Sequence, residues 1–136
     1  MGRTGRVFVG VLAGAALWAV LWVGGTAGAR AAFPELLDPT RRLEHVGALL
    51  ALTGYSVVLS ILAGYVAATL AGAATAAAGM RAAWLLAWLQ LAIGLVVEIS
   101  SWELLPVWYH VLFLALIVPA TVYGGRLRTR RRATAP

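Results

Sequence analysis

The central stretch VGALLALTGYSVVLSILAGYVAATLAGAATAAAGM, residues 46–80, carries no charged residue over 35 positions. A membrane-spanning helix needs about 20 apolar residues, so this stretch is too long for one span and calls for two. Its Gly- and Ala-rich part, residues 72–79, is too weakly apolar to hold a bilayer centre. We therefore expect one span at about 46–70 and another at about 81–99, with the break ending near Gly79.

Two further spans flank this central stretch. Residues 7–29 form an uncharged run preceded by Arg3 and Arg6. Its length of 23 residues exceeds the 7–15 of a signal-peptide core, which favours a retained span. A fourth span is expected at about 105–124, with Pro106 in its first turn, where a missing N–H costs little. Pro119 lies inside this span and is predicted to bend or end the helix.

The composition agrees with a membrane protein. Of 136 residues, 62% are hydrophobic and only 12% are charged, about half the level of soluble domains. The absence of cysteine excludes disulfides, thiolate metal sites and cysteine nucleophiles. The net charge of +6 comes from arginines beside apolar runs, so it indicates topology rather than nucleic-acid binding. The sequence predicts a single polytopic domain over residues 1–136, all-α, folded as a four-helix transmembrane bundle.

The arginines also predict an orientation. With four spans, one side of the membrane receives eight of them: Arg3, Arg6, Arg81, Arg126, Arg128, Arg130, Arg131 and Arg132. The other side receives Arg30, Arg41 and Arg42, in or beside a loop at about 30–45. By the positive-inside rule, both termini are expected to be cytoplasmic and this loop to lie outside.

Small and polar residues within the spans indicate helix packing. Gly10 and Gly14 form one GxxxG pattern and Gly24 and Gly28 form another, and such residues let helix backbones approach closely. Gln90, near the middle of the third span, is expected to bond a neighbouring helix.

The ionisable residues of the outer side form the one candidate site. Its members are Glu44, His45, Glu98, Glu103 and His110. Glu98 and His110 lie inside spans, where ionisable groups are costly and need a reason. Because a short connection makes the third and fourth spans antiparallel neighbours, these two side chains are expected within reach of each other. The pair has three readings: a structural contact, a site for a lipid headgroup, quinone or partner helix, or a metal or haem site.

Metal and catalytic chemistry have little support in the pattern. The chain has two histidines and no H-x-x-E-H or E-x-x-H spacing. His45 should also lie about 8 Å shallower than His110, whereas two axial haem ligands need similar depth. There is no phosphate-binding loop with lysine and no G-x-S-x-G elbow. We therefore assign no catalytic residue, metal ligand or cofactor, and the chain is not expected to be an enzyme.

Three short stretches carry a resemblance to a known group of proteins: AGYVAA at 63–68, PVWYH at 106–110 and VPATVYGGRL at 118–127. Together they resemble a group of small, uncharacterised bacterial inner-membrane proteins with four spans. The resemblance implies a multi-pass inner-membrane protein and carries no activity. It suits structural roles for Gly64 in close packing, Trp108 in interfacial anchoring and Arg126 in stopping the fourth helix.

Two functions follow as expectations. The first is a small accessory or structural subunit that packs with itself, as a homo-oligomer, or with a larger membrane complex. The alternative is a membrane protein that binds a lipid, quinone, haem or metal near its outer face through Glu98 and His110.

The topology can be tested by cysteine labelling, because the native chain has no cysteine to interfere. An Asp38→Cys variant should react with a membrane-impermeant maleimide added to intact cells, since position 38 is expected outside. Labelling of this cysteine only from the cytoplasmic side would contradict the four-span orientation.

Overall fold

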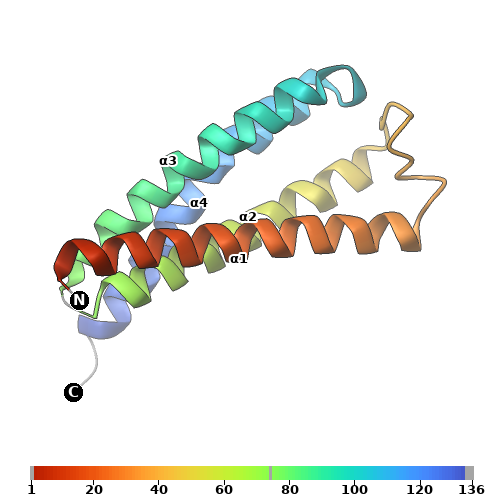
Figure 1. The fold of residues 1–136 in the computed structure, drawn as a ribbon. Coiled ribbons are helices and arrows are strands. Elements are labelled where there is room, and N and C mark those ends of the chain that lie inside the picture. Colours follow the sequence, from red (N-terminus) through yellow and green to blue (C-terminus); the bar gives the residue numbers. More distant parts are fainter. Residues whose placement is uncertain (1, 74, 134–136) are drawn as a thin grey trace.

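A computed structural model describes residues 2–73 and 75–133, and its secondary structure there is helical (Figure 1). The elements are α1 (Arg3–Ala32), α2 (Val46–Ala71), α3 (Ala76–Ser100), the short 3₁₀ helix η1 (Trp102–Leu104) and α4 (Val107–Ala133). Each of the four α-helices is long and apolar enough to cross a membrane. The predicted all-α class with four long apolar helices is therefore confirmed.

The break in the central stretch is shorter than expected. α3 begins at Ala76, because the Thr75 hydroxyl accepts a hydrogen bond of 3.1 Å from the Ala78 N–H and caps the helix. The expected boundary near Gly79 is wrong, since this residue lies inside the first turns of α3. There it packs on α2: a methyl group on Gly79 would lie 2.9 Å from the Ala68 carbonyl oxygen.

Two prolines, Pro34 and Pro106, lie beside helix ends, whereas Pro119 lies inside a helix. α1 ends one residue before Phe33, which precedes Pro34, a position where helical backbone is disfavoured. Pro106 lies just before α4, and its carbonyl accepts the Tyr109 N–H at 3.0 Å. By contrast, α4 continues through Pro119 and Arg126 to Ala133, so neither residue ends the helix. One lost backbone bond on an exposed face does not end a helix that packs on neighbours along its length.

The closest packing in the bundle is a crossing of the α2 and α4 backbones. A methyl group on Gly64 would lie 1.9 Å from the Thr121 carbonyl oxygen, and one on Gly124 would lie 2.0 Å from the Ile61 carbonyl oxygen. The close-packing role expected for Gly64 is thus confirmed. Gly10 and Gly14 bring α1 onto α2 in the same way, with ideal methyl positions 2.6 Å and 2.9 Å from the Ala67 and Ala63 oxygens.

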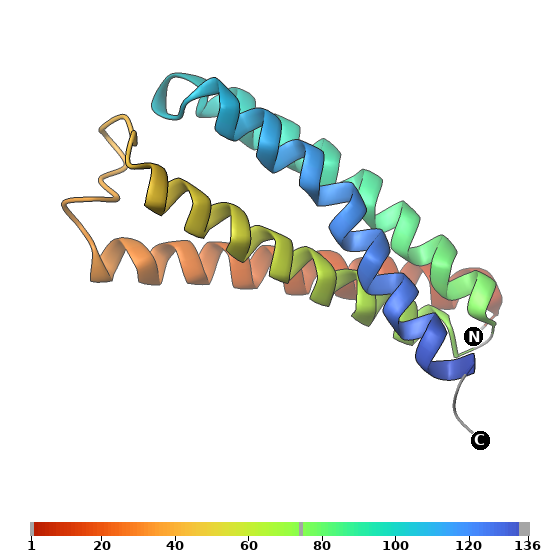
Figure 2. The same cartoon turned by 180° about the vertical axis from the view of Figure 1, so that it is seen from behind.

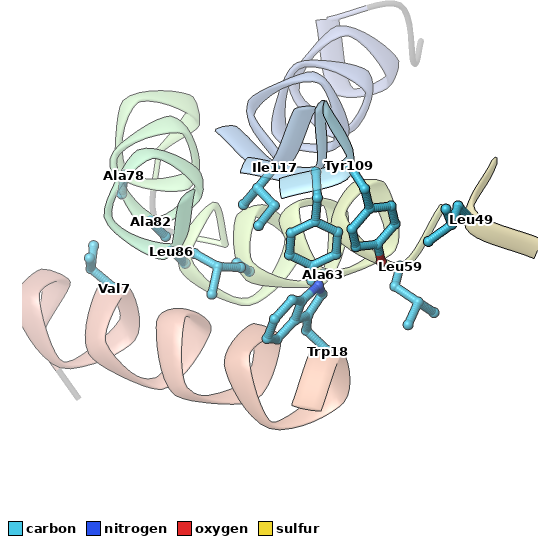
Figure 3. Close-up of a cluster of buried hydrophobic side chains, with 13 residues drawn as sticks. Val7, Trp18, Leu49, Leu59, Ala63, Ala78, Ala82, Leu86, Tyr109 and Ile117 are labelled. Carbon is cyan, nitrogen blue, oxygen red and sulfur yellow. The ribbon is translucent and has the colours of Figure 1, made fainter. Parts of the chain in front are cut away.

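Apolar and polar contacts complete the core. Figure 3 shows Trp18, Leu86, Tyr109 and Ile117 among the buried side chains that meet from different helices. The Thr121 hydroxyl donates to the Gln90 side-chain oxygen at 2.6 Å, which joins α4 to α3 as expected for Gln90.

The helices do not stay equally close along the bundle. α1 and α2 form one pair and α3 and α4 another, and the two pairs diverge away from the end where α1 begins and α4 finishes (Figures 1 and 2). We call that end the terminus end, and the opposite end, which carries residues 33–45 and η1, the loop end. One backbone hydrogen bond of 2.9 Å, from the Leu43 N–H to the Leu104 carbonyl, ties the two loops together there.

The glycine crossing generates the first structural prediction. Gly64→Ala and Gly124→Ala should each destabilise the protein by about 3 kcal/mol, the upper part of the range for overpacking, because the added methyl group would meet backbone. Gly54→Ala is the matched control in α2, since its methyl group would meet nothing within 4 Å. Thermal unfolding in mild detergent measures the difference. Equal stability of all three variants would show that the crossing is not tight.

Candidate functional site

The candidate site is a cavity of about 230 Å³ at the loop end, between the two diverging helix pairs. Apolar side chains from α1, α2, α3, α4 and the loops form much of its wall: Trp22, Leu37, Leu43, Leu52, Val97, Leu104, Leu105 and Tyr109. Four charged residues also line it: Arg30, Asp38, Arg41 and Glu98. The lining is therefore amphipathic.

Aromatic rings extend the apolar wall of the cavity toward the bundle centre. The Trp22 ring lies 6.3 Å from that of Trp18, 6.0 Å from that of Tyr55 and 5.4 Å from that of Phe113, measured between centroids. The Tyr55 hydroxyl donates to the Leu21 carbonyl at 2.5 Å, which holds α2 to α1 at this level. This set of rings joins both helix pairs below the cavity.

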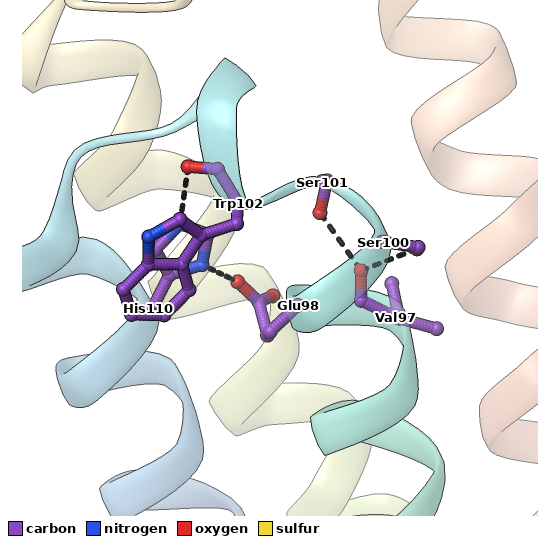
Figure 4. Close-up of polar contacts among 6 residues, drawn as sticks. All are labelled: Val97, Glu98, Ser100, Ser101, Trp102 and His110. Atoms are coloured by element: carbon purple, nitrogen blue, oxygen red, sulfur yellow. Dashed lines mark hydrogen bonds and ion pairs between the residues drawn. The ribbon is translucent and has the colours of Figure 1, made fainter.

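Glu98 and His110 form a buried pair between α3 and α4 (Figure 4). His110 Nδ1 contacts a carboxylate oxygen of Glu98, and the two side chains are 1% and 4% exposed. On its other side, His110 Nε2 faces the Trp102 carbonyl at 3.3 Å. The Trp102 indole stacks on the imidazole, with centroids 4.5 Å apart and planes at 10°. The histidine is therefore held by its two nitrogens and by one ring face.

These contacts limit how many protons the pair holds. A carbonyl oxygen only accepts hydrogen bonds, so Nε2 of His110 carries a hydrogen that it donates to Trp102. The contact between Nδ1 and Glu98 then contains one further proton, held by the imidazole or by the carboxyl group. In both cases the pair as a whole has no net charge. This neutrality explains how two ionisable groups are tolerated in the interior of an apolar bundle.

The other predicted members of the cluster do not join this pair. Glu44 is exposed and forms an ion pair of 3.2 Å with Arg42. His45 caps α2, where its Nδ1 accepts the Ala48 N–H at 3.1 Å. Glu103 lies exposed in η1. The five residues thus divide into one buried pair and three separate groups at the loop end.

The sequence reasoning missed the loop residues that line the cavity. Asp38 accepts hydrogen bonds from the Thr40 hydroxyl at 2.7 Å and the Thr40 N–H at 2.8 Å. These two bonds lower the pKa of the Asp38 carboxyl group below its usual value, and the bond from the Thr40 hydroxyl has the larger effect. Asp38 is therefore ionised at neutral pH. The sequence Asp38-Pro39-Thr40 carries the signal for this turn, because aspartate commonly bonds the backbone two residues on.

The geometry gives no support to a metal or haem at Glu98 and His110. Both histidine nitrogens already have partners, so neither has a free lone pair directed at a ligand position. Among residues 2–73 and 75–133, no three His, Asp or Glu side chains are grouped closely enough to hold a metal ion. What the site offers instead is an amphipathic cavity next to a neutral polar pair.

The pair can be tested by a double-mutant cycle of Glu98→Gln and His110→Ala, read by thermal unfolding in detergent. We expect a coupling free energy of about 1–2 kcal/mol, because each single change leaves a buried polar partner unsatisfied. Glu103→Gln combined with His110→Ala is the control, since Glu103 is an exposed acid of the same hairpin, and the two changes should add. Additive effects in the Glu98 cycle would show that the pair contributes no coupling.

Comparison with known proteins adds no family to this geometry. No protein-family model, no curated protein and no solved structure matches the chain at a significant level. The resemblance to small four-span bacterial proteins stays a prediction.

Proposed function

We propose that this chain is a small multi-pass protein of a bacterial inner membrane that serves as an accessory or structural subunit without catalytic chemistry. It packs with itself or with a larger membrane complex. Both termini lie on the cytoplasmic side, a topology supported by the eight-to-three distribution of arginines. The arrangement of the helices supports it too, because α1 begins and α4 finishes at the same end of the bundle (Figure 1).

The observation that carries the proposal is the bare face of α1 toward the loop end. Methyl groups on Gly24 and Gly28 would meet no atom within 4 Å, while the neighbouring Val20 and Val23 are 69% and 65% exposed. α1 is also the least covered helix: 22% of its most apolar 18 residues are buried, against 44% for α4. In a bilayer, small residues at an exposed face let the backbone of another helix approach closely.

The exposed faces of the other pair differ from this one. Large side chains cover them, among them Val96, Ile99 and Val111, which are 69%, 63% and 62% exposed. Such branched side chains suit contact with acyl chains. The face of α1 differs in carrying Gly24 and Gly28 beside its exposed valines, so a partner helix can approach its backbone more closely there.

A second candidate function is the binding of a membrane-derived ligand in the cavity at the loop end. The amphipathic lining of this cavity favours it. The ligand would contact the cavity wall, which includes Glu98, while His110 stays occupied by its two partners.

The subunit function is tested with the double variant Gly24→Leu and Gly28→Leu. Purified wild-type protein in mild detergent should run as a complex, with itself or with one stoichiometric partner, by size-exclusion chromatography with light scattering. The affinity within the complex should fall about tenfold or more in the variant, equivalent to about 1.4 kcal/mol, because leucine side chains hold the backbones apart.

Gly54→Leu serves as the control, because Gly54 also has open space at its Cβ position but lies on α2. This variant should keep the complex. A wild-type protein that is monomeric and free of partners, or a double variant that assembles normally, would contradict the proposal.

A further inference from the structure

The cavity at the loop end arranges its polar and apolar groups by depth. Trp22 and Arg30 both line it from α1, and at 1.5 Å per residue they lie about 12 Å apart along the helix axis. Trp22 belongs to the aromatic wall, while Arg30 lies in the last turn of α1 and Arg41 in the following loop. A charged rim thus stands above an apolar interior, which is the order of a phospholipid headgroup and its acyl chain.

The charges of the rim leave an excess of positive charge. Arg30 and Arg41 contribute two positive charges and Asp38 contributes one negative charge, while Glu98 is neutralised within its pair with His110. Asp38 already accepts two hydrogen bonds from Thr40. Within the described residues, neither Arg30 nor Arg41 forms an ion pair. The sum is one positive charge, which complements a headgroup of net charge −1.

The cavity also has a side that faces the apolar surroundings of the bundle. Val97 and Leu104 line the cavity and are nevertheless 44% and 37% exposed, so they form the edge of a side opening between the cavity and the outer surface of the helices. The volume of about 230 Å³ is below the roughly 300–1,000 Å³ of a pocket that encloses a whole small-molecule ligand. A volume of this size suits a phosphate group and the first part of one acyl chain, and the remainder of the chain would leave past Val97 into the bilayer.

From this geometry we infer that the cavity binds one anionic phospholipid of the adjoining leaflet. Its phosphate lies between Arg30 and Arg41, and the upper part of one acyl chain contacts Trp22 and Tyr109. Arginine suits this role, because its guanidinium group can donate two parallel hydrogen bonds to phosphate oxygens. The inference rests on the second candidate function, ligand binding at the loop end, and adds the chemical class of the ligand.

Native mass spectrometry of the delipidated protein in detergent tests the inference, with phosphatidylglycerol and phosphatidylcholine of identical chains as probes. The wild type should bind one phosphatidylglycerol at least tenfold more tightly than one phosphatidylcholine. An Arg30→Gln/Arg41→Gln variant should lose this preference; both residues are exposed, so folding is not at risk. Arg42→Gln is the control for the change at Arg41, since it removes one positive charge from the same loop outside the cavity.

A second variant tests the apolar part separately. Val97→Trp should fill the side opening and reduce binding of phosphatidylglycerol at least tenfold while every charge of the rim stays in place. Millimolar inorganic phosphate should leave the bound lipid in place. Displacement by phosphate would mean a site for a free anion and would overturn the lipid assignment.

The remaining outcomes separate this inference from the function on which it rests. Equal binding of the two lipids by the wild type would overturn the anionic class and leave ligand binding standing. A preference that survives in the Arg30→Gln/Arg41→Gln variant would overturn the assignment of the headgroup to these arginines. Binding of neither lipid, by a protein that unfolds cooperatively, would overturn both the inference and the ligand-binding function.

Discussion

The contact between the α2 and α4 backbones at Gly64 and Gly124 determines how the four helices are placed relative to one another. In a bilayer, apolar side chains gain little by leaving lipid for protein, so close packing has to supply the association of helices. Gly64 lies about 27 Å along α2 from its first residue, and Gly124 about 26 Å along α4, at 1.5 Å per residue. Two helices that cross near one end separate toward the other, so the crossing itself generates the divergence at the loop end.

Contacts within each helix pair keep its two helices together, so the two pairs diverge from each other as units. Glu98 and His110 hold α3 to α4 near the loop end, and Tyr55 holds α2 to α1 through the Leu21 carbonyl. Each helix pair is thus fixed internally on its own side of the cavity. Between the pairs, the bond from Leu43 to Leu104 crosses the gap above the cavity wall. The loop end is therefore two fixed hairpins with a lined space between them.

The sequence predicts the helices better than it predicts the cavity. An uncharged stretch reports how many spans a chain can form, and a short hairpin forces neighbours such as Glu98 and His110 together. The break does not extend to Gly79, because weak hydropathy does not prevent a helix that Thr75 caps and that packs on α2. The placement of Arg30 and Arg41 at one cavity depends on how far the helix pairs diverge. That angle follows from the glycine crossing and leaves no local signal in the loop.

The arrangement of charge separates the structural and the binding roles of the loop end. Both ring nitrogens of His110 contact partners in its own hairpin, so a ligand could bond to His110 only by breaking one of these contacts. Among the described residues, Arg30 and Arg41 form no ion pair with a carboxylate, and both line the cavity, where a dissolved anion or a lipid headgroup can reach them. Buried polar groups that satisfy each other stabilise one structure, whereas exposed cations beside an apolar space remain available for recognition. Of the ionisable residues that the sequence singles out, Glu98 alone lines the cavity, and the proposed recognition of an anion there rests on Arg30 at the end of α1 and Arg41 in the loop.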